Sequence, residues 1–377
     1  MPGLYLHIPF CRQACHYCDF HFSTSLARKP AVLAALAREV ELRADFFGPN
    51  PAPLTSIYFG GGTPSLLTAD ELLALFEHIG RFFAWAADAE ITLEANPDDL
   101  SPQWLADLRA TPVNRLSVGI QSFHEPHLRL MNRAHSAADA LTCLGRARDA
   151  GFANFSLDLI YGIPAPDHSA WARDLDTALA LAPPHLSAYA LTVEPRTALG
   201  RWTAKGRFRP STDDFTARQF ELLTTALVGA GYEHYEISNF ARPGRHARHN
   251  SAYWDGAAYL GLGPSAHSFD GRATRWATVA SNAAYVAALE RGELPATAET
   301  LTPRDRANEY LMTSLRTSRG TDLARLRTEF GRDVRATHAA YLADLLARGL
   351  ATHHADTLRL TTAGRLLADD ITLALFE

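Results

Sequence analysis

Short apolar runs alternate with longer amphipathic stretches up to about residue 240, and each run ends in polar or glycine-rich sequence. This alternation is typical of parallel strands joined by crossover helices. Polar motif residues recur at the carboxyl ends of the runs, which form the catalytic face of a barrel. We therefore predict an α/β fold, a partial (β/α)6 TIM-type barrel rather than a doubly wound sheet. The predicted strands are Leu4–Ile8, Ser56–Phe59, Glu90–Glu94, Arg115–Ile120, Phe155–Ile160 and His185–Leu191, with a weaker seventh at Tyr235–Ile237. The predicted helices are Pro30–Phe47, Ala69–Phe83, Pro102–Thr111, Ala137–Ala150 and Ser169–Leu181.

Three of the four cysteines, Cys11, Cys15 and Cys18, directly follow the first predicted strand with the spacing C-x3-C-x2-C. A [4Fe–4S] cluster normally takes four thiolates, so a run that supplies three leaves one iron atom open to a ligand. Disulfides are disfavoured, because no hydrophobic signal peptide precedes the run and its cysteine count is odd.

A structural zinc site is the remaining alternative for these cysteines, and it needs a fourth ligand. The nearby histidines that could supply that ligand are His7, His16 and His21. His7 and His16 are otherwise expected to tune a cluster by hydrogen bonding. The fourth cysteine, Cys143, is predicted to be a small buried helix residue rather than a distant ligand.

Polar residues also follow or end the later strands. Gly60-Gly61-Gly62-Thr63-Pro64 comes after the second strand, where glycines let the backbone approach a ligand closely. An ordinary tight turn is the alternative. Glu94 ends the next strand and could accept hydrogen bonds from ribose hydroxyls or an ammonium group. Gln121, Arg133 and Asp158 lie farther along, and Asp158 inside an apolar strand needs a partner, either Arg133 or a ligand. Together these groups indicate a ligand pocket.

The cysteine run resembles the signature of radical S-adenosylmethionine (SAM) proteins, in which SAM chelates the open iron and is cleaved to a 5′-deoxyadenosyl radical. Over essentially the whole chain the motifs are similar to the family of oxygen-independent coproporphyrinogen III dehydrogenase (HemN) and its heme chaperone branch. The motifs that carry this resemblance are Tyr-Phe-Gly-Gly-Gly-Thr-Pro-Ser, Leu-Glu-Ala-Asn-Pro, Arg-Leu-Ser-Val-Gly-Ile-Gln-Ser-Phe, Asp-Leu-Ile-Tyr-Gly-Ile-Pro and Tyr-Glu-Ile-Ser-Asn-Phe-Ala.

This resemblance implies roles for individual residues. Cys11, Cys15 and Cys18 would ligate the [4Fe–4S] cluster. The residues that would touch the cluster-bound SAM are Tyr5, Gly61 and Glu94. In the dehydrogenase a second SAM molecule lies near positions that correspond here to Tyr17, Gly62, Thr63, Gln121, Arg133, Asp158 and about Thr192. Whether this chain binds one or two SAM molecules stays open.

Two departures separate this chain from the dehydrogenase branch. The dehydrogenase has an extra cysteine two residues after the third ligand, where this chain has Phe20, and an N-terminal extension before the strand that begins here at Leu4. A third feature, the segment His249-Asn250-Ser-Ala-Tyr253-Trp254, matches the H-N-x-x-Y-W motif of the chaperone branch.

That motif also has a chemical meaning of its own. Imidazole is a common axial ligand of heme iron, so His249 is the proposed ligand, with Asn250 beside it, and Tyr253 and Trp254 can pack on a porphyrin. The alternative is that the motif caps a loop. His267, in a glycine-rich turn, is a second candidate contact to heme or SAM.

From about Leu301 the pattern changes to three helices and a hairpin, Pro303–Thr317, Asp322–Phe330, Val334–Arg348 and two strands around Ala355-Asp356, as in a winged helix. Mixed local charge favours a lid or docking module over DNA binding. We thus predict three parts: a radical SAM barrel (1–240), a connecting segment with the H-N-x-x-Y-W motif (241–300) and a winged-helix-like domain (301–377). The segment from Leu199 to Phe215 is predicted to be an exposed basic loop.

The composition fits a cytoplasmic globular protein, with 47% hydrophobic and 20% charged residues among 377 and a net charge of −5. No apolar run reaches the ~18 residues of a membrane span, and the charge favours no nucleic acid partner. The leading hypothesis is a heme chaperone that carries the cluster and SAM, takes an electron from a donor and passes heme to an acceptor protein. The alternatives are oxidative decarboxylation of coproporphyrinogen III and a related radical methyltransferase or heme-degrading enzyme.

Overall fold

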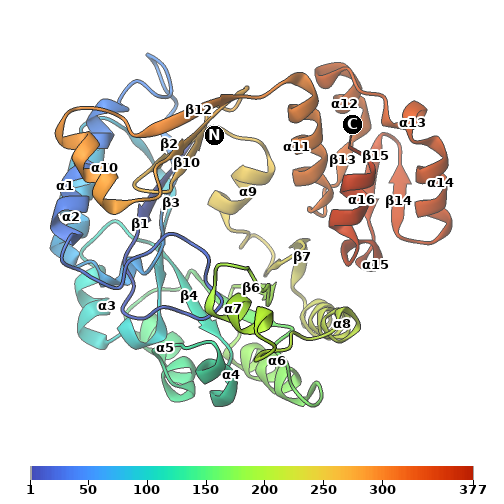
Figure 1. Ribbon diagram of the computed structural model, residues 1–377, viewed down its shortest axis with the longest axis horizontal. Coiled ribbons are helices and arrows are strands. Elements are labelled where there is room, and N and C mark those ends of the chain that lie inside the picture. The colour runs from blue at the N-terminus through green and yellow to red at the C-terminus, as the bar shows by residue number, and fades with distance from the viewer. Residues whose placement is uncertain (1, 377) are drawn as a thin grey trace.

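The computed structural model describes residues 2–376, and its main body is a curved sheet (Figure 1). The first strands of this sheet run parallel and pair with one another in chain order, which confirms the predicted α/β fold with a partial barrel. These strands are β1 (Gly3–Ile8), β2 (Leu54–Gly61), β3 (Trp85–Ala95), β4 (Arg115–Gln121), β5 (Phe155–Tyr161) and β6 (His185–Ala190).

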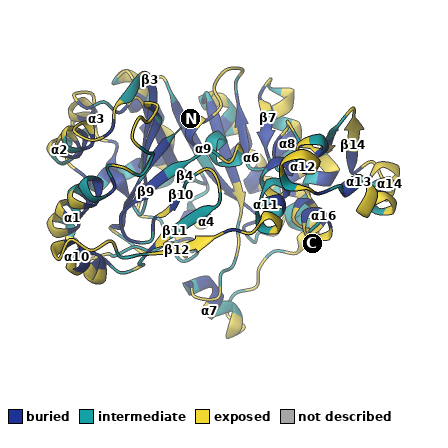
Figure 2. Ribbon diagram, turned by 90° about the horizontal axis from the view of Figure 1, so that it is seen from above, coloured by how far each residue is buried: buried dark blue, intermediate teal, exposed yellow. Residues whose placement is uncertain are grey.

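Apolar side chains cover the face of these parallel strands that is turned toward the crossover helices, so the strands form the centre of the molecule (Figure 2). Leu4, Leu6 and Ile8 of β1 are fully buried, as are Leu157 and Leu159 of β5. In a barrel of parallel strands the crossover helices form an outer ring that packs against this face. Alternate residues such as Glu94, Ser117 and Asp158 lie on the opposite face and line a cavity, so the apolar residues of the runs are explained by burial against the helices.

Crossover helices lie outside the parallel strands (Figure 1). They are α1 (Lys29–Leu42), α2 (Ala69–Gly80), α3 (Pro102–Leu108), α4 (Glu125–Leu130), α5 (Ala137–Asp149) and α6 (Ser169–Leu181), with short 3₁₀ turns at Pro64–Leu66 and Pro97–Asp99. Capping boxes start two of them: Thr68 and Glu71 satisfy each other's backbone N–H groups at α2, and Ser136 and Asp139 do so at α5. These caps fix where α2 and α5 begin after the loops that follow the preceding strands.

The sheet continues past both ends of the parallel set. Beyond β6 lie two antiparallel strands, and on the other side β9 pairs in parallel with β1 and is followed by antiparallel strands. Residues 241–300, predicted as a connecting segment, thus include strands of the sheet. The added strands are β7 (Glu233–Glu236), β8 (Asn239–Ala241), β9 (Tyr259–Leu262), β10 (His267–Phe269), β11 (Thr274–Thr278) and β12 (Ala296–Thr300).

Four further helices belong to this body. They are α7 (Ala198–Ala204), α8 (Asp213–Gly229), α9 (Arg248–Trp254) and α10 (Asn282–Glu290). The prediction of a loop from Leu199 to Phe215 was wrong at its start, because Thr197 caps α7 through the N–H of Gly200. Helix α7 packs against the cysteine loop, because the N–H of Leu199 donates to the carbonyl of His16 and the ring of Trp202 contacts that of His16.

The C-terminal part has its own hydrophobic core and its own small sheet (Figure 1). The predicted order of helices and hairpin is confirmed, although the third predicted helix is broken at His338. The elements are α11 (Pro303–Leu315), β13 (Thr321–Asp322), α12 (Leu323–Phe330), α13 (Val334–Thr337), α14 (Ala339–Ala347), β14 (Ala351–His354), β15 (Thr357–Leu360), α15 (Thr362–Arg365) and α16 (Ala368–Ala374).

The C-terminal part is attached to the sheet by contacts around Arg316. Its guanidinium lies 3.1 Å from the buried carboxylate of Glu236 in β7 and over the ring of Trp254 at the end of α9. Arg319 forms an ion pair with Asp255 next to it. In residues 2–376 we find no helix with the length and apolar character needed to cross a membrane.

Candidate functional site

The cysteine loop leaves the carboxyl end of β1 and folds over it. The N–H of Cys11 donates to the carbonyl of Ser23, and the N–H of Cys18 donates to the carbonyl of Cys15. Cys11, Cys15 and Cys18 are half-buried free thiols that line one cavity of about 670 Å³, which we call the first cavity. Cys143 is fully buried in α5, as predicted, and does not line this cavity.

The surroundings of the three thiols suit a cluster. A [4Fe–4S] cluster takes each thiolate on a different iron atom, and the three cysteines line the same cavity without having to meet at one point. Arg133 donates through Nη1 to the sulfur of Cys15 at 3.3 Å, and its Nε is buried without a hydrogen-bond partner among the described residues. Burial raises the pKa of the Cys18 thiol to about 11, so a cluster would have to displace its proton.

The glycine loop after β2 is held against the cysteine loop. The N–H of Gly62 donates to the carbonyl of Ile8 at 2.9 Å, and the N–H of Thr63 donates to that of Phe10 at 2.7 Å. A Cβ at position 62 would lie 2.6 Å from the backbone oxygen of Phe10, and Gly61 has φ of 103°. Only glycine fits this close approach, so the loop is more than an ordinary turn.

Glu94 is directed at the same place from the end of β3. One of its carboxylate oxygens accepts from the hydroxyl of Tyr58 at 2.8 Å, and the other accepts from the N–H of Gly61 at 3.2 Å. Burial raises the pKa of Glu94 to about 7, with the nearby carboxylate of Asp158 adding to the effect. A cationic ligand would favour the ionised form of this carboxyl.

The sequence predicted either Arg133 or a ligand as the partner of Asp158. Arg133 is not that partner, because the two side chains do not pair. The carboxylate of Asp158 accepts hydrogen bonds from the hydroxyls of Ser117 at 2.8 Å and Ser156 at 2.7 Å. Arg133 instead donates to the side chain of Asn96 and the carbonyl of Gly119. The serines, which sequence reasoning missed, provide the compensation that a buried carboxylate needs.

The first cavity gathers nearly all of the residues predicted for SAM. Gln121, at the end of β4, has φ of 65°, which turns the chain there into the cavity wall. Tyr5 is the exception: it lines the neighbouring cavity and stacks against Tyr58. The predicted residues that line the first cavity are Tyr17, Gly61, Gly62, Thr63, Glu94, Gln121, Arg133, Asp158 and Thr192.

The H-N-x-x-Y-W motif forms helix α9. His249 is only 3% exposed, and both of its ring nitrogens are engaged, Nδ1 with the hydroxyl of Ser56 at 2.8 Å and Nε2 with that of Tyr253 at 2.9 Å. Neither nitrogen is free for iron in this arrangement. Asn250 lines the first cavity, whereas Tyr253 and Trp254 line a second cavity of about 640 Å³.

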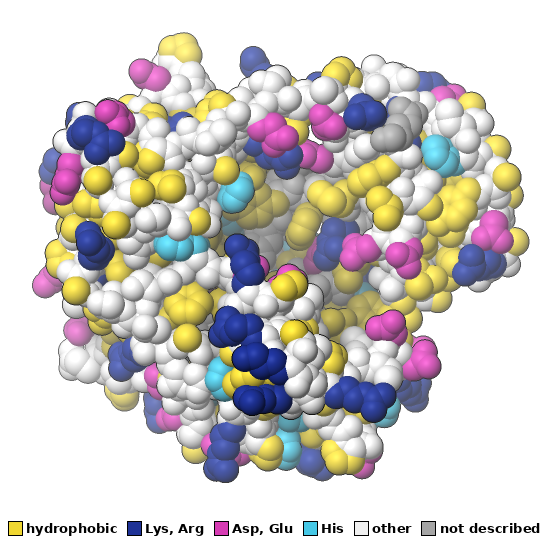
Figure 3. Space-filling model, in the orientation of Figure 1, with side chains coloured by type: hydrophobic (Ala, Val, Ile, Leu, Met, Phe, Trp, Pro, Cys, Tyr) yellow, Lys and Arg dark blue, Asp and Glu magenta, His cyan; other side chains and the backbone are white. Residues whose placement is uncertain are grey.

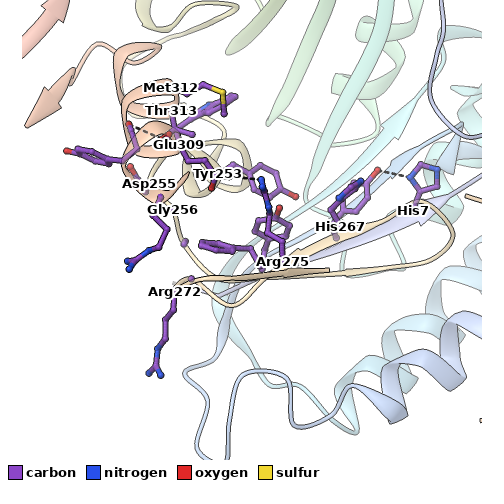
Figure 4. Close-up of a pocket in the computed structure, with 18 of the residues that line it drawn as sticks. His7, Tyr253, Asp255, Gly256, His267, Arg272, Arg275, Glu309, Met312 and Thr313 are labelled. Atoms are coloured by element: carbon purple, nitrogen blue, oxygen red, sulfur yellow. Dashed lines mark hydrogen bonds and ion pairs between the residues drawn. The ribbon is translucent and has the colours of Figure 1, made fainter. Parts of the chain in front are cut away.

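The second cavity lies between the sheet and the C-terminal helices, where Figure 3 shows the molecule hollowed. Figure 4 shows Glu309, Met312 and Thr313 of α11 on one side and His7 and His267 of the strands on the other. Asp19 and Phe20, which follow the third cysteine, line both cavities. The two cavities are therefore neighbours.

Comparison with known proteins places this geometry in a family. The radical SAM superfamily model matches residues 5–177, and the HemN C-terminal domain model matches residues 301–367. A protein of Mycobacterium tuberculosis named heme chaperone HemW is 39% identical over 98% of this chain and 93% of its own length. The protein of the same name from Bacillus subtilis is 34% identical over 98% of both chains.

The chain belongs to the HemW family of heme chaperones. The resemblance derived from the motifs is thereby confirmed. The solved structure of coproporphyrinogen III oxidase (HemN) from Escherichia coli is similar over 100% of this chain and 90% of its own, with a TM-score of 0.84 and 26% identity. Radical SAM membership implies a [4Fe–4S] cluster and SAM as cofactors, and the residues of the first cavity fit both.

Proposed function

We propose that this protein binds heme and transfers it to an acceptor protein, with a [4Fe–4S] cluster on Cys11, Cys15 and Cys18 and SAM on the open iron. HemW relatives along nearly the whole chain support this proposal. The observation that carries it is the second cavity, because the Tyr253 and Trp254 side chains of the family motif line it next to the cluster loop. A cavity of this size accommodates an organic ligand.

The residues of the first cavity would hold the cofactors. The cluster and SAM together supply one-electron chemistry, for which an external protein would provide the electron. Arg133 orients the Cys15 sulfur through its hydrogen bond, and Glu94 offers a carboxylate to an ammonium or ribose group. Asp158 and Gln121 line the same cavity, where they can bind a second polar group of the ligand. We place this activity in the cytoplasm.

The proposal is tested by anaerobic titration of the cluster-loaded protein with ferric heme, followed by absorption spectroscopy. Saturable one-to-one binding is expected, followed by transfer to apomyoglobin as a generic acceptor at a rate that depends on the concentration of the acceptor. A His249→Ala variant run alongside tests whether the motif contributes. Absence of saturable binding by the wild-type protein contradicts the proposal.

A second candidate function is oxidative decarboxylation of coproporphyrinogen III, favoured by the similarity of the whole fold to coproporphyrinogen III oxidase. Phe20 lines both cavities and is 73% exposed. It stands where the dehydrogenase branch has its extra cysteine, and this difference argues against the second candidate function. An anaerobic assay with coproporphyrinogen III and SAM, read by mass spectrometry, decides between the two. Formation of vinyl products would replace our proposal with this one.

A further inference from the structure

The walls of the second cavity suit a flat aromatic ligand. Tyr253 and Trp254 come from α9, Tyr259 from β9, and Tyr310 and Phe330 from the C-terminal part. These rings arise from three regions of the chain and converge on one space. Aromatic side chains of this kind stack on the face or edge of a conjugated ring system.

The histidines around this cavity differ in whether they can bind a metal. His7 is 5% exposed and engages both ring nitrogens, with the Tyr5 hydroxyl at 3.2 Å and the His21 carbonyl at 2.9 Å. His21 uses Nε2 on Asn282 at 2.7 Å. His249 is engaged on both nitrogens as described above.

His267 is the contrasting case. It lies on β10, its side chain is exposed, and within residues 2–376 no hydrogen bond or ion pair is made by its ring. Figure 4 shows it at the strand side of the cavity, between His7 and Arg275. A neutral imidazole with a free nitrogen is a common axial ligand of heme iron.

Positive charge remains uncompensated at this cavity. Each carboxylate that lines it has an arginine partner: Asp19 pairs with Arg196, Asp255 with Arg319 and Glu309 with Arg275. In the described part of the chain, Arg272 and Arg306 of the lining have no carboxylate partner, and Arg306 lies over the ring of Phe330. Figure 4 shows Arg272 extending outward at the edge of the cavity.

We propose that heme binds in the second cavity with His267 as its protein ligand and with Arg272 and Arg306 on its propionates. This inference rests on the proposed function and assigns its site. Heme carries two carboxylates on one edge, and guanidinium groups at the mouth of a cavity bind such groups well. The aromatic walls would enclose the ring.

His249 then acts as a positioning residue. Glu90 accepts hydrogen bonds from the backbone N–H groups of Arg248 and His249, and the His249 ring in turn holds the hydroxyl of Tyr253. The motif thereby fixes Tyr253 as part of the cavity wall. Loss of His249 would loosen this wall without removing an iron ligand.

The test uses full-length, cluster-loaded protein and ferric heme, with absorption and electron paramagnetic resonance spectra of the heme. His267→Ala is expected to lose the signature of a nitrogen ligand and to bind heme about tenfold more weakly. Added free imidazole should restore the signature in this variant. His354→Ala, an exposed histidine on β14 that does not line the cavity, is the matched control and should behave as the wild type.

His249→Gln and His21→Ala separate this inference from its competitors. Both are expected to keep the nitrogen signature, and His249→Gln to bind more weakly. Tyr253→Phe serves in place of His249→Gln if that buried variant does not fold, because it removes the same hydrogen bond. An unchanged spectrum in His267→Ala, or loss of the signature in either competitor, overturns the inference while leaving the proposed function intact. No heme binding by the wild type overturns both.

The arginines are tested with heme dimethyl ester, which lacks the two charges. The wild type should prefer heme over the ester by about tenfold, since each charge-assisted contact contributes modestly at an exposed site. An Arg272→Gln/Arg306→Gln double variant should lose this preference. An equal preference in wild type and double variant overturns this part of the assignment.

Discussion

The two neighbouring cavities are built on different principles. In the first, polar groups at the ends of parallel strands hold one another: Tyr58 and Gly61 donate to Glu94, and Ser117 and Ser156 donate to Asp158. The second cavity is assembled from added strands, α9 and C-terminal helices, and its polar groups are partly uncommitted. The first cavity is suited to cofactors that stay bound, whereas the second cavity is suited to a ligand that binds reversibly.

The largest effect expected from this comparison is on the cluster alone. Cys18→Ser should abolish the broad visible absorption of the [4Fe–4S] cluster, because the two remaining thiolates are too few to hold the cluster. Heme affinity should change by less than about threefold, since the second cavity does not include this thiol. Cys143→Ala, a cysteine buried in α5, is the control and should keep its cluster. Parallel loss of heme binding in Cys18→Ser would contradict the separation of the sites.

Arg133 tests how the first cavity orders its metal ligands. Arg133→Met removes the hydrogen bonds to Cys15 and Asn96, and we expect the cluster to be held about 10- to 100-fold less tightly, as for other groups that orient metal ligands. Cluster retention against a chelator, followed by absorbance, measures this. Arg129→Met on the exposed face of α4 should have no effect, and equal cluster loss in the two variants would contradict the assigned role.

Glu94 gives the first cavity a pH dependence. Its pKa is raised by burial to about 7, so the carboxyl is mostly protonated at pH 6 and mostly ionised at pH 8. Binding of a ligand with an ammonium group favours the ionised form, and SAM affinity should therefore rise by up to about tenfold over this range. Calorimetric titration at both pH values measures it. Glu94→Gln should bind SAM weakly and with little change between them, and a pH dependence preserved in that variant would assign the effect to another group.

Phe20 should give the smallest effect. Phe20→Ala is expected to reduce heme affinity about threefold through lost apolar contact, while the free energy of unfolding changes by less than about 0.5 kcal/mol because the side chain is 73% exposed. Heme titration and urea unfolding measure the two quantities. Leu373→Ala, which removes a 67% exposed side chain on α16, should change neither.

Much of the parallel sheet could be predicted, because each central strand is a buried apolar run that ends in glycine or polar residues. The observed bounds of a strand differ from the predicted ones where its residues are not buried. Strand β3 begins at Trp85 rather than Glu90, because its first residues are partly exposed and give no apolar run. The strands β8 to β12 were missed: β11 and β12 are mostly outside the core and give no apolar run, and β9 pairs with β1 from the opposite end of the chain. Helix α8 was also missed, although Thr212 followed by two acidic residues is a usable start signal.

The residues of the candidate site could be predicted from the sequence, but most of the hydrogen bonds between them could not. Glu94 and Asp158 stand out because carboxylates are costly in apolar strands. Their partners Ser117 and Ser156 carry no such signal, since serine is unremarkable in a strand. The bond between His249 and Tyr253 could have been found from their i, i+4 spacing, which places them on one helix face. The second cavity could not, because its walls meet only in the folded chain.

The separation of the two cavities is tested most directly by titrating the cluster-loaded protein with heme in the presence and absence of saturating SAM. The account predicts that heme binds with one-to-one stoichiometry in both cases and that its dissociation constant changes by less than about threefold, because the ligands occupy different spaces. If SAM displaces heme, the apparent affinity of the protein for heme falls in proportion to the SAM concentration. This result would place both ligands in one cavity and contradict the account.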